Sequence, residues 1–220
     1  APEEEIARFD TGDPDRDAYL AMLRVMDEGV GRVLDSLERL DLEEDTLVLF
    51  FSDNGGAKNN ASINGPLRDY KHSVYEGGVR VPFLLRWPKR IPAGMVSDEP
   101  VISIDAFATI LAAAGVEPPQ DRVIDSRDMV PVLTGELDGP LHERLYWNWM
   151  DKDSDDGWAI RKGRWKLLAD KNDMELYDLE ADLGETRNLV SEEPERVREL
   201  LADYQSWRGE LAPRIRRAKR

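Results

Sequence analysis

The chain has 220 residues, of which 45 are acidic and 30 are basic, so its formal net charge is −15. This charge repels phosphate backbones and argues against nucleic-acid binding, and no apolar run approaches the roughly 20 residues that a bilayer-spanning helix needs. Cys is absent and His occurs only as His72 and His142, which excludes disulfides, thiolate metal sites and a multi-His zinc site.

A long amphipathic helix is predicted over residues 14–40. Asp13 suits the N-cap position, and Pro14 suits the first helical position, where a missing N–H has no intrahelical partner to lose. Apolar residues then recur at steps of three and four, which places them on one helix face: Leu23, Met26, Val30, Val33, Leu34 and Leu37.

The apolar run over residues 46–51 predicts a buried parallel strand of an α/β sheet. It stops at a polar turn that contains Asp53 and Asn54. A long loop over residues 55–79 and a second strand over residues 80–87 are predicted next. Because ligands of open α/β sheets bind at the carboxyl ends of strands, the polar turn lies where chemistry is expected.

A further helix is predicted over residues 103–114. Ser103 is the expected N-cap, Asp105 lies in the first turn, where a negative charge favours the helix dipole, and Gly115 ends the helix. Residues 116–140 carry no regular pattern.

After residue 140 the pattern changes to short strand-like runs separated by turn residues, which predicts an antiparallel meander. The runs are residues 145–150, 158–161, 165–169 and 175–178. A last amphipathic helix is predicted over residues 194–211. His142 lies at the junction and is interpreted as structural.

Two sets of residues are candidates for a functional site. Asp53 and Asn54 offer a carboxylate and an amide oxygen, hard donors that suit Ca²⁺ or Mg²⁺, although an Asp-Asn-Gly sequence is also typical of a plain turn. Lys71 could neutralise an ester oxygen of a sulfate or phosphate, although a surface lysine paired with Asp69 is the alternative.

Taken together, the motifs of this chain resemble the sulfatase family of the alkaline-phosphatase-like superfamily. The resemblance rests on Phe-Ser-Asp-Asn-Gly at 51–55, Leu-Arg-x-x-Lys at 67–71 and Glu-Gly-Gly-x-Arg-x-Pro at 76–82. Arg-Trp-Pro at 86–88, the helix that follows Ser103 and Leu-Tyr-Asp-Leu at 176–179 continue it in the family's order.

The resemblance implies an α/β fold of the alkaline-phosphatase-like type. Residues 1–140 would form the C-terminal half of the catalytic domain, and residues 141–220 a small antiparallel sheet with a helix. It also implies hydrolysis of sulfate esters with Ca²⁺ and a formylglycine. Asp53 and Asn54 match two metal ligands, and Lys71 matches the lysine that contacts the sulfate.

His72 directly follows Lys71 and is a second catalytic candidate. It could contact a sugar or aryl group of the substrate or protonate the leaving oxygen, and a structural or solvent-facing histidine is the alternative.

Several parts of the family's site are missing from this sequence. The C/S-x-P/A-x-R motif that becomes formylglycine does not occur, and neither do the early pair of metal-binding Asp residues and the upstream Arg, Lys and His. We therefore expect an N-terminal part of the same enzyme as partner, no turnover by these residues alone, and oligomerisation through exposed apolar surface.

Two other functions remain open on the sequence. One is a phosphatase or phosphodiesterase of the same superfamily, which would use more Asp and His ligands around two metals. The other is a non-catalytic interaction module that keeps the motifs as relics and binds Ca²⁺ poorly.

Overall fold

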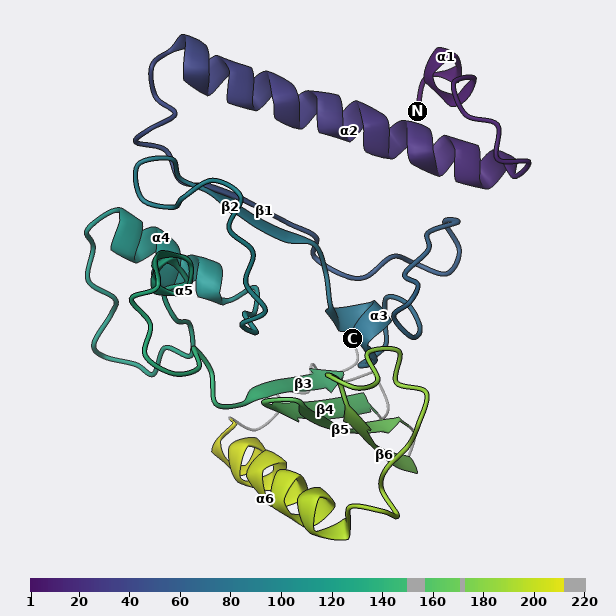
Figure 1. Ribbon diagram of the computed structural model, residues 1–220, viewed down its shortest axis with the longest axis vertical. Coiled ribbons are helices and arrows are strands. Elements are labelled where there is room, and N and C mark those ends of the chain that lie inside the picture. Colours follow the sequence, from purple (N-terminus) through teal and green to yellow (C-terminus); the bar gives the residue numbers. More distant parts are fainter. Residues whose placement is uncertain (150–156, 171–172, 212–220) are drawn as a thin grey trace, which may run out of the picture. The chain divides into compact units, whose positions relative to one another are not determined.

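A computed structural model describes residues 1–149, 157–170 and 173–211 of the chain (Figure 1). The chain divides into two units. The first unit consists of Ala1–Asn64, Asp69–Lys71 and Gly77–Glu143. The second unit consists of Gly65–Arg68, His72–Glu76 and Arg144–Arg220. Two short pieces of an internal loop therefore belong with the C-terminal part of the chain.

The first unit begins with a short helix, α1 (Glu3–Ile6), and a long one, α2 (Pro14–Arg39). The predicted start of α2 is confirmed, because the Asp13 carboxylate accepts hydrogen bonds from the backbone amides of Asp15 and the residue after it. These bonds satisfy amides that have no partner inside the helix.

Half of the apolar face predicted for α2 is exposed, and its other three residues, Val30, Leu34 and Leu37, are half-buried. Ala21 is the buried residue of this helix. Four large apolar side chains along α2 are 39% to 58% exposed: Met22, Leu23, Met26 and Val33. Within the described residues, this helix thus buries far less apolar surface than its sequence pattern predicts.

Strand β1 (Val48–Phe51) pairs with β2 (Phe83–Arg86). The pairing is antiparallel, with Val48 opposite Arg86, and the rings of Phe51 and Phe83 stack with centroids 5.0 Å apart. The prediction of a buried parallel strand was therefore wrong in direction, and β1 is only half-buried. An apolar run specifies a strand but does not encode the direction of its partner.

Helix α4 (Asp105–Ala113) starts at a different residue from the one predicted. Its N-cap position is Ile104 rather than Ser103. The carboxylate of Asp105 instead accepts the backbone N–H of Ile102 at 2.9 Å. Gly115, with φ +66°, follows the helix end as predicted, because glycine tolerates the left-handed region.

Asp105 is fully buried and organises the surroundings of α4. Its carboxylate also accepts the backbone N–H of Arg127 at 2.8 Å, and the Nε2 atom of His142 lies 3.0 and 2.9 Å from its two oxygens. These contacts agree with the structural interpretation of His142. They also show that Asp105 fixes a neighbouring loop rather than only favouring a helix dipole.

Like α1, two further short helices occur in stretches for which no regular structure was predicted. They are α3 (Glu76–Val79) and α5 (Val130–Thr134). None of the helices in the described part of the chain combines the length and the apolar character needed to cross a bilayer.

The second unit contains the predicted antiparallel meander. Its strands are β3 (Leu145–Trp149), β4 (Gly157–Lys162), β5 (Trp165–Asp170) and β6 (Asp173–Asp178), in the order β3-β4-β5-β6 (Figure 1). Helix α6 (Pro194–Glu210) follows, close to its predicted bounds. Met150, the predicted end of the first run, lies outside the described residues.

Both faces of this sheet carry a hydrophobic core, because successive strand residues point to opposite faces. One core joins strand residues to α6: Ile160, Leu167, Leu176, Val197, Leu200 and Tyr204. The other joins strand residues to the loop segment His72–Glu76: Ala159, Leu168, Tyr177, Leu179, Val74 and Tyr75. The loop segment is therefore an integral part of the second unit.

Candidate functional site

The polar turn after β1 presents the two predicted metal ligands. Asp53 is exposed and Asn54 is half-buried. The Oγ atom of Ser52 donates to the carbonyl of Asn54 at 2.7 Å, which closes the turn locally. Carboxylate and amide oxygens are hard donors, so this turn can supply two of the roughly six to eight oxygens that Ca²⁺ takes.

Close packing against α3 fixes this turn. The backbone N–H of Gly55 donates to the carbonyl of Gly78 at 3.1 Å. A Cβ atom at Gly55 would lie 1.8 Å from the carbonyl oxygen of Gly77. Because no side chain fits there, the turn needs glycine at this position in order to approach α3.

The backbone of Lys71 lies against the same turn. Its N–H donates to the carbonyl of Gly56 at 3.0 Å, and both residues belong to the first unit. The Lys71 side chain is exposed. The structure thus brings the main chain at Lys71 next to the segment that carries Asp53 and Asn54, two of the predicted site residues.

His72 has a different setting from Lys71. It is exposed, adopts a positive φ of +77° and belongs to the second unit. Asp69, two residues before Lys71, also has a positive φ, of +65°. Such angles are uncommon outside glycine and are found where surrounding contacts hold the backbone in place.

A side chain that the sequence analysis did not single out connects these segments. The Asn64 Oδ1 atom accepts the Gly56 N–H at 3.0 Å. Its Nδ2 atom donates to the Gly56 carbonyl at 3.1 Å and to the Asp69 carbonyl at 3.0 Å. The sequence signal was weak, because an asparagine in a polar loop is commonplace.

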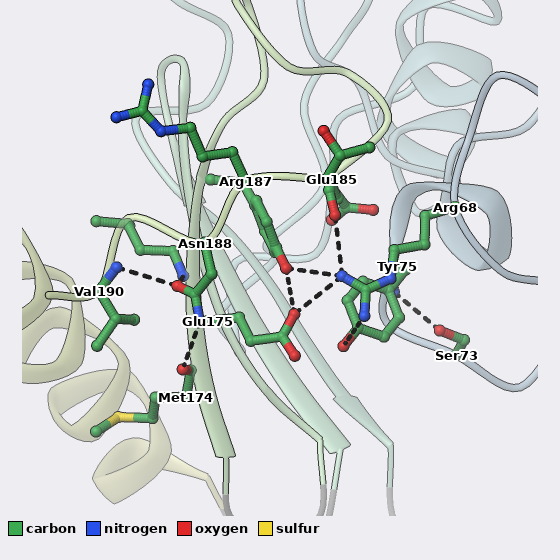
Figure 2. Close-up of polar contacts among 12 residues, drawn as sticks. Arg68, Ser73, Tyr75, Met174, Glu175, Glu185, Arg187, Asn188 and Val190 are labelled. Atoms are coloured by element: carbon green, nitrogen blue, oxygen red, sulfur yellow. Dashed lines mark hydrogen bonds and ion pairs between the residues drawn. The ribbon is translucent and has the colours of Figure 1, made fainter. Parts of the chain in front are cut away.

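Arg68 lies at the centre of a polar cluster in the second unit, as Figure 2 shows. Its Nη1 atom donates to Glu175 at 3.1 Å and to the Tyr177 hydroxyl at 2.7 Å. It also donates to the Glu185 carbonyl at 2.9 Å, while Nη2 donates to the Tyr75 hydroxyl at 3.1 Å. Burial and the neighbouring Glu175 raise the pKa of both Tyr75 and Tyr177, so the two phenols stay protonated.

A second buried cluster centres on Lys166 of β5. Its ammonium lies 2.8 Å from a carboxylate oxygen of Glu76 and 2.8 Å from one of Glu185, and all three side chains are buried. The backbone N–H of Glu76 donates to Glu185 at 2.6 Å. Burial raises the pKa of Glu185 in spite of the neighbouring Lys166. Sequence reasoning missed this cluster, because its members lie far apart in the chain.

The described residues contain no group of three or more His, Cys, Asp or Glu side chains arranged to hold a metal ion. The donor chemistry of Asp53 and Asn54 nevertheless fits a hard cation such as Ca²⁺. These residues therefore fit part of a calcium site whose further ligands would come from elsewhere.

Two family models match the sequence. The model described as Sulfatase matches residues 2–116, which is about half of the chain. The model described as N-sulphoglucosamine sulphohydrolase, C-terminal, matches residues 69–206. The two matches overlap across the segment that contains Lys71.

Curated relatives align with the chain over part of its length. Steryl-sulfatase of Mus musculus is 43% identical over 137 residues, which are 59% of this chain and 22% of that protein. N-acetylgalactosamine-6-sulfatase of Canis lupus familiaris is 42% identical over 137 residues, which are 60% of this chain and 26% of that protein. The chain thus spans about a quarter of these relatives' length.

Solved structures share the fold. The crystal structure of Ps i-CgsB in complex with k-i-k-neocarrahexaose is 30% identical, with a TM-score of 0.87, and the match covers 94% of this chain and 46% of that chain. This confirms the predicted alkaline-phosphatase-like α/β fold class. A likeness to the phosphonate monoester hydrolase of Agrobacterium radiobacter, at 22% identity and a TM-score of 0.68, concerns the fold alone.

Proposed function

Because the chain belongs to the sulfatase family, we propose that it forms the C-terminal part of an enzyme that hydrolyses sulfate esters. The observation that carries this proposal is the hydrogen bond from the Lys71 N–H to Gly56, which holds the Lys71 segment beside the Asp53–Asn54 turn. A cationic side chain and a pair of hard oxygen ligands are thereby carried by adjacent segments of one unit.

Each candidate residue has a distinct role in this proposal. Asp53 and Asn54 would hold Ca²⁺, or Mg²⁺ as the alternative, and the cation would draw charge from the sulfate oxygens. The Lys71 ammonium would contact a sulfate oxygen and stabilise the negative charge that grows there during hydrolysis. His72 would contact the leaving group of the ester or protonate its oxygen.

The remaining machinery, including a formylglycine, would come from an N-terminal part of the same enzyme. Two observations support this division. The aligned region spans only 22% of the mouse relative and 46% of the Ps i-CgsB chain. Large apolar side chains of the first unit are also exposed, among them Met26, Val33 and Leu84 at 48%, 58% and 57%.

The same proposal assigns different roles to the two parts of the chain. Residues 1–140 would contribute to the catalytic α/β domain. Residues 141–220, with the meander and α6, would form a small subdomain attached to it.

The proposal is tested by comparing the parent enzyme with this chain alone. The full-length protein and the 220-residue chain would each be assayed with an aryl sulfate, sulfated sugars, a sterol sulfate and an aryl phosphate, with and without Ca²⁺. We expect sulfate release by the full-length protein only. Turnover by the chain alone would refute the division, and cleavage of the phosphate without the sulfates would support the phosphatase alternative.

A further inference from the structure

The Asn64 side chain uses both ends of its amide on one residue. Its oxygen accepts the Gly56 N–H at 3.0 Å and its nitrogen donates to the Gly56 carbonyl at 3.1 Å. The same nitrogen donates to the Asp69 carbonyl at 3.0 Å. Among side chains, only Asn and Gln carry a donor and an acceptor in this arrangement, so the contact depends on residue type.

The packing around Gly56 is as specific as its hydrogen bonds. A Cβ atom at Gly56 would lie 2.8 Å from Asn64 Oδ1 and 2.4 Å from Ser62 Oγ. The Ser62 hydroxyl in turn donates to the Ala57 carbonyl at 2.6 Å. Because residue 56 is glycine, the side chains of Ser62 and Asn64 can contact its main chain directly.

The Asp69 carbonyl lies just before Lys71, on a residue held at φ +65°. Such a backbone conformation costs free energy in a non-glycine residue and persists where neighbouring contacts enforce it. The hydrogen bond from Asn64 is one such contact. The Lys71 N–H then donates to the same Gly56 carbonyl that accepts from Asn64.

We propose that Asn64 is a positioning residue that sets the place of Lys71 relative to the turn that carries Asp53 and Asn54. This inference rests on the proposed function, because Lys71 acts on the sulfate only in that function. Asn64 itself acts through the main chain at Gly56 and Asp69.

Hydrogen exchange measured on the 220-residue chain tests the geometry without any activity. Asn64→Ala removes both donors and the acceptor, so the Lys71 amide, which donates to the Gly56 carbonyl, should exchange about tenfold faster. Asn59→Ala, at an exposed position of the same loop, is the matched control and should leave the exchange of the Lys71 amide unchanged. Unchanged exchange at β1, which lies in the same unit as Asn64, would show that the Asn64→Ala variant is folded.

Steady-state kinetics of the full-length enzyme test the catalytic consequence. We expect Asn64→Ala and Asn64→Asp to lower kcat by about 10- to 100-fold, with less than about a threefold change in KM, because a misplaced group costs turnover more than binding. A double-mutant cycle adds Lys71→Ala. If Asn64 acts through Lys71, Asn64→Ala should have no further effect in the Lys71→Ala background.

The exchange and kinetic experiments together distinguish a failure of this inference from a failure of the proposed function. Absence of sulfate release by the wild-type full-length enzyme would refute the proposed function and, with it, the catalytic role of Asn64. Faster exchange together with additive kinetic losses in an active enzyme would overturn the positioning role alone. Unchanged exchange of the Lys71 amide in folded Asn64→Ala would overturn the anchoring itself.

Discussion

Lys166 and Glu185 form an ion pair of 2.8 Å in which both side chains are completely buried, and Glu76 completes the cluster at 2.8 Å from the same ammonium. One cation thus faces two carboxylates away from solvent. A buried charge that loses its partner is costly, so removal of one member of this cluster should strongly destabilise the second unit.

The first prediction concerns the ammonium of this cluster. Lys166→Met keeps most of the unbranched side chain but leaves Glu76 and Glu185 buried without a cation. We expect the free energy of unfolding at pH 7 to fall by about 3–5 kcal/mol, measured by urea denaturation. Lys162→Met, which removes partly exposed ion pairs with Glu199 and Asp203, should cost about 1 kcal/mol or less. Equal losses in the two variants would contradict the prediction.

The second prediction concerns pH. Because burial raises the pKa of Glu185 above its ordinary value of 4.5, the folded protein binds this proton more tightly than the unfolded chain does. The free energy of unfolding should therefore fall as pH rises from 4.5 through the folded-state pKa. In Glu185→Gln this slope should be smaller, as measured by urea denaturation at a series of pH values.

A carboxylate with the opposite shift provides the control for this measurement. Lys162 lowers the pKa of Glu199, so this residue contributes stability that is lost as pH falls through its folded-state pKa. Glu199→Gln should therefore alter the slope on the acid side only. If the free energy of unfolding depends on pH identically in wild type and Glu185→Gln, the assignment of this pH dependence to Glu185 is wrong.

The third prediction compares two glycines. Gly55→Ala places a Cβ atom 1.8 Å from the Gly77 carbonyl oxygen and should lower the free energy of unfolding by about 1–3 kcal/mol. Gly31→Ala in α2 meets nothing within 4 Å and should stabilise it by about 0.5–1 kcal/mol. Thermal denaturation measures both, and opposite shifts in Tm are expected.

The fourth prediction separates Asp53 from Lys71 in the full-length enzyme. Asp53→Ala removes the carboxylate that we propose binds calcium, so raising Ca²⁺ should restore part of its activity. Lys71→Ala should lower kcat by about 10²–10³-fold, and added Ca²⁺ should not restore it. Lys71→Arg should also be impaired, because a planar fork does not replace a compact ammonium. Near-normal turnover of Lys71→Ala across a calcium titration would remove Lys71 from the site.

The fifth prediction concerns the exposed apolar face of α2. The chain alone should bind a hydrophobic dye and self-associate, whereas the full-length protein should bind less dye. Met26→Lys and Val33→Lys should reduce both effects without loss of Tm, because these side chains are 48% and 58% exposed. Ala21→Lys, at a fully buried position, should instead unfold the helix. A monomeric chain that binds no dye would contradict this prediction.

The elements that the sequence predicted well are those whose signal is local. Asp13 and Pro14 mark the start of α2, and the meander follows from short runs between turns. The predicted direction of β1 was wrong. Its partner strand lies more than thirty residues away, so the apolar run itself carries no information about the direction of pairing. The Ser103 N-cap was wrong because the amides of Asp105 and Ala106, which such a cap would bind, donate to the backbone carbonyls of Ile102 and Ser103 instead.

The residues of the candidate site also differ in whether they have a local sequence signal. Asp53, Asn54 and Lys71 were found because they lie in recognisable motifs, and their catalytic roles stay predictions. Asn64 was missed because its function lies in hydrogen bonds to main-chain atoms, which any loop asparagine could make. Lys166 was missed because its two carboxylates come from distant parts of the chain.

The distance along the chain between Glu76 and Glu185 also bears on synthesis of the protein. The hydrogen bond from the Glu76 N–H to the Glu185 carboxylate joins residues 109 positions apart. At about 5–20 residues per second, a ribosome takes roughly 5 to 20 seconds to deliver Glu185 after Glu76. During that interval the loop with Lys71 has emerged without the sheet to which its neighbouring segments belong. The order of translation thus makes the completion of this loop wait for the synthesis of β5 and β6.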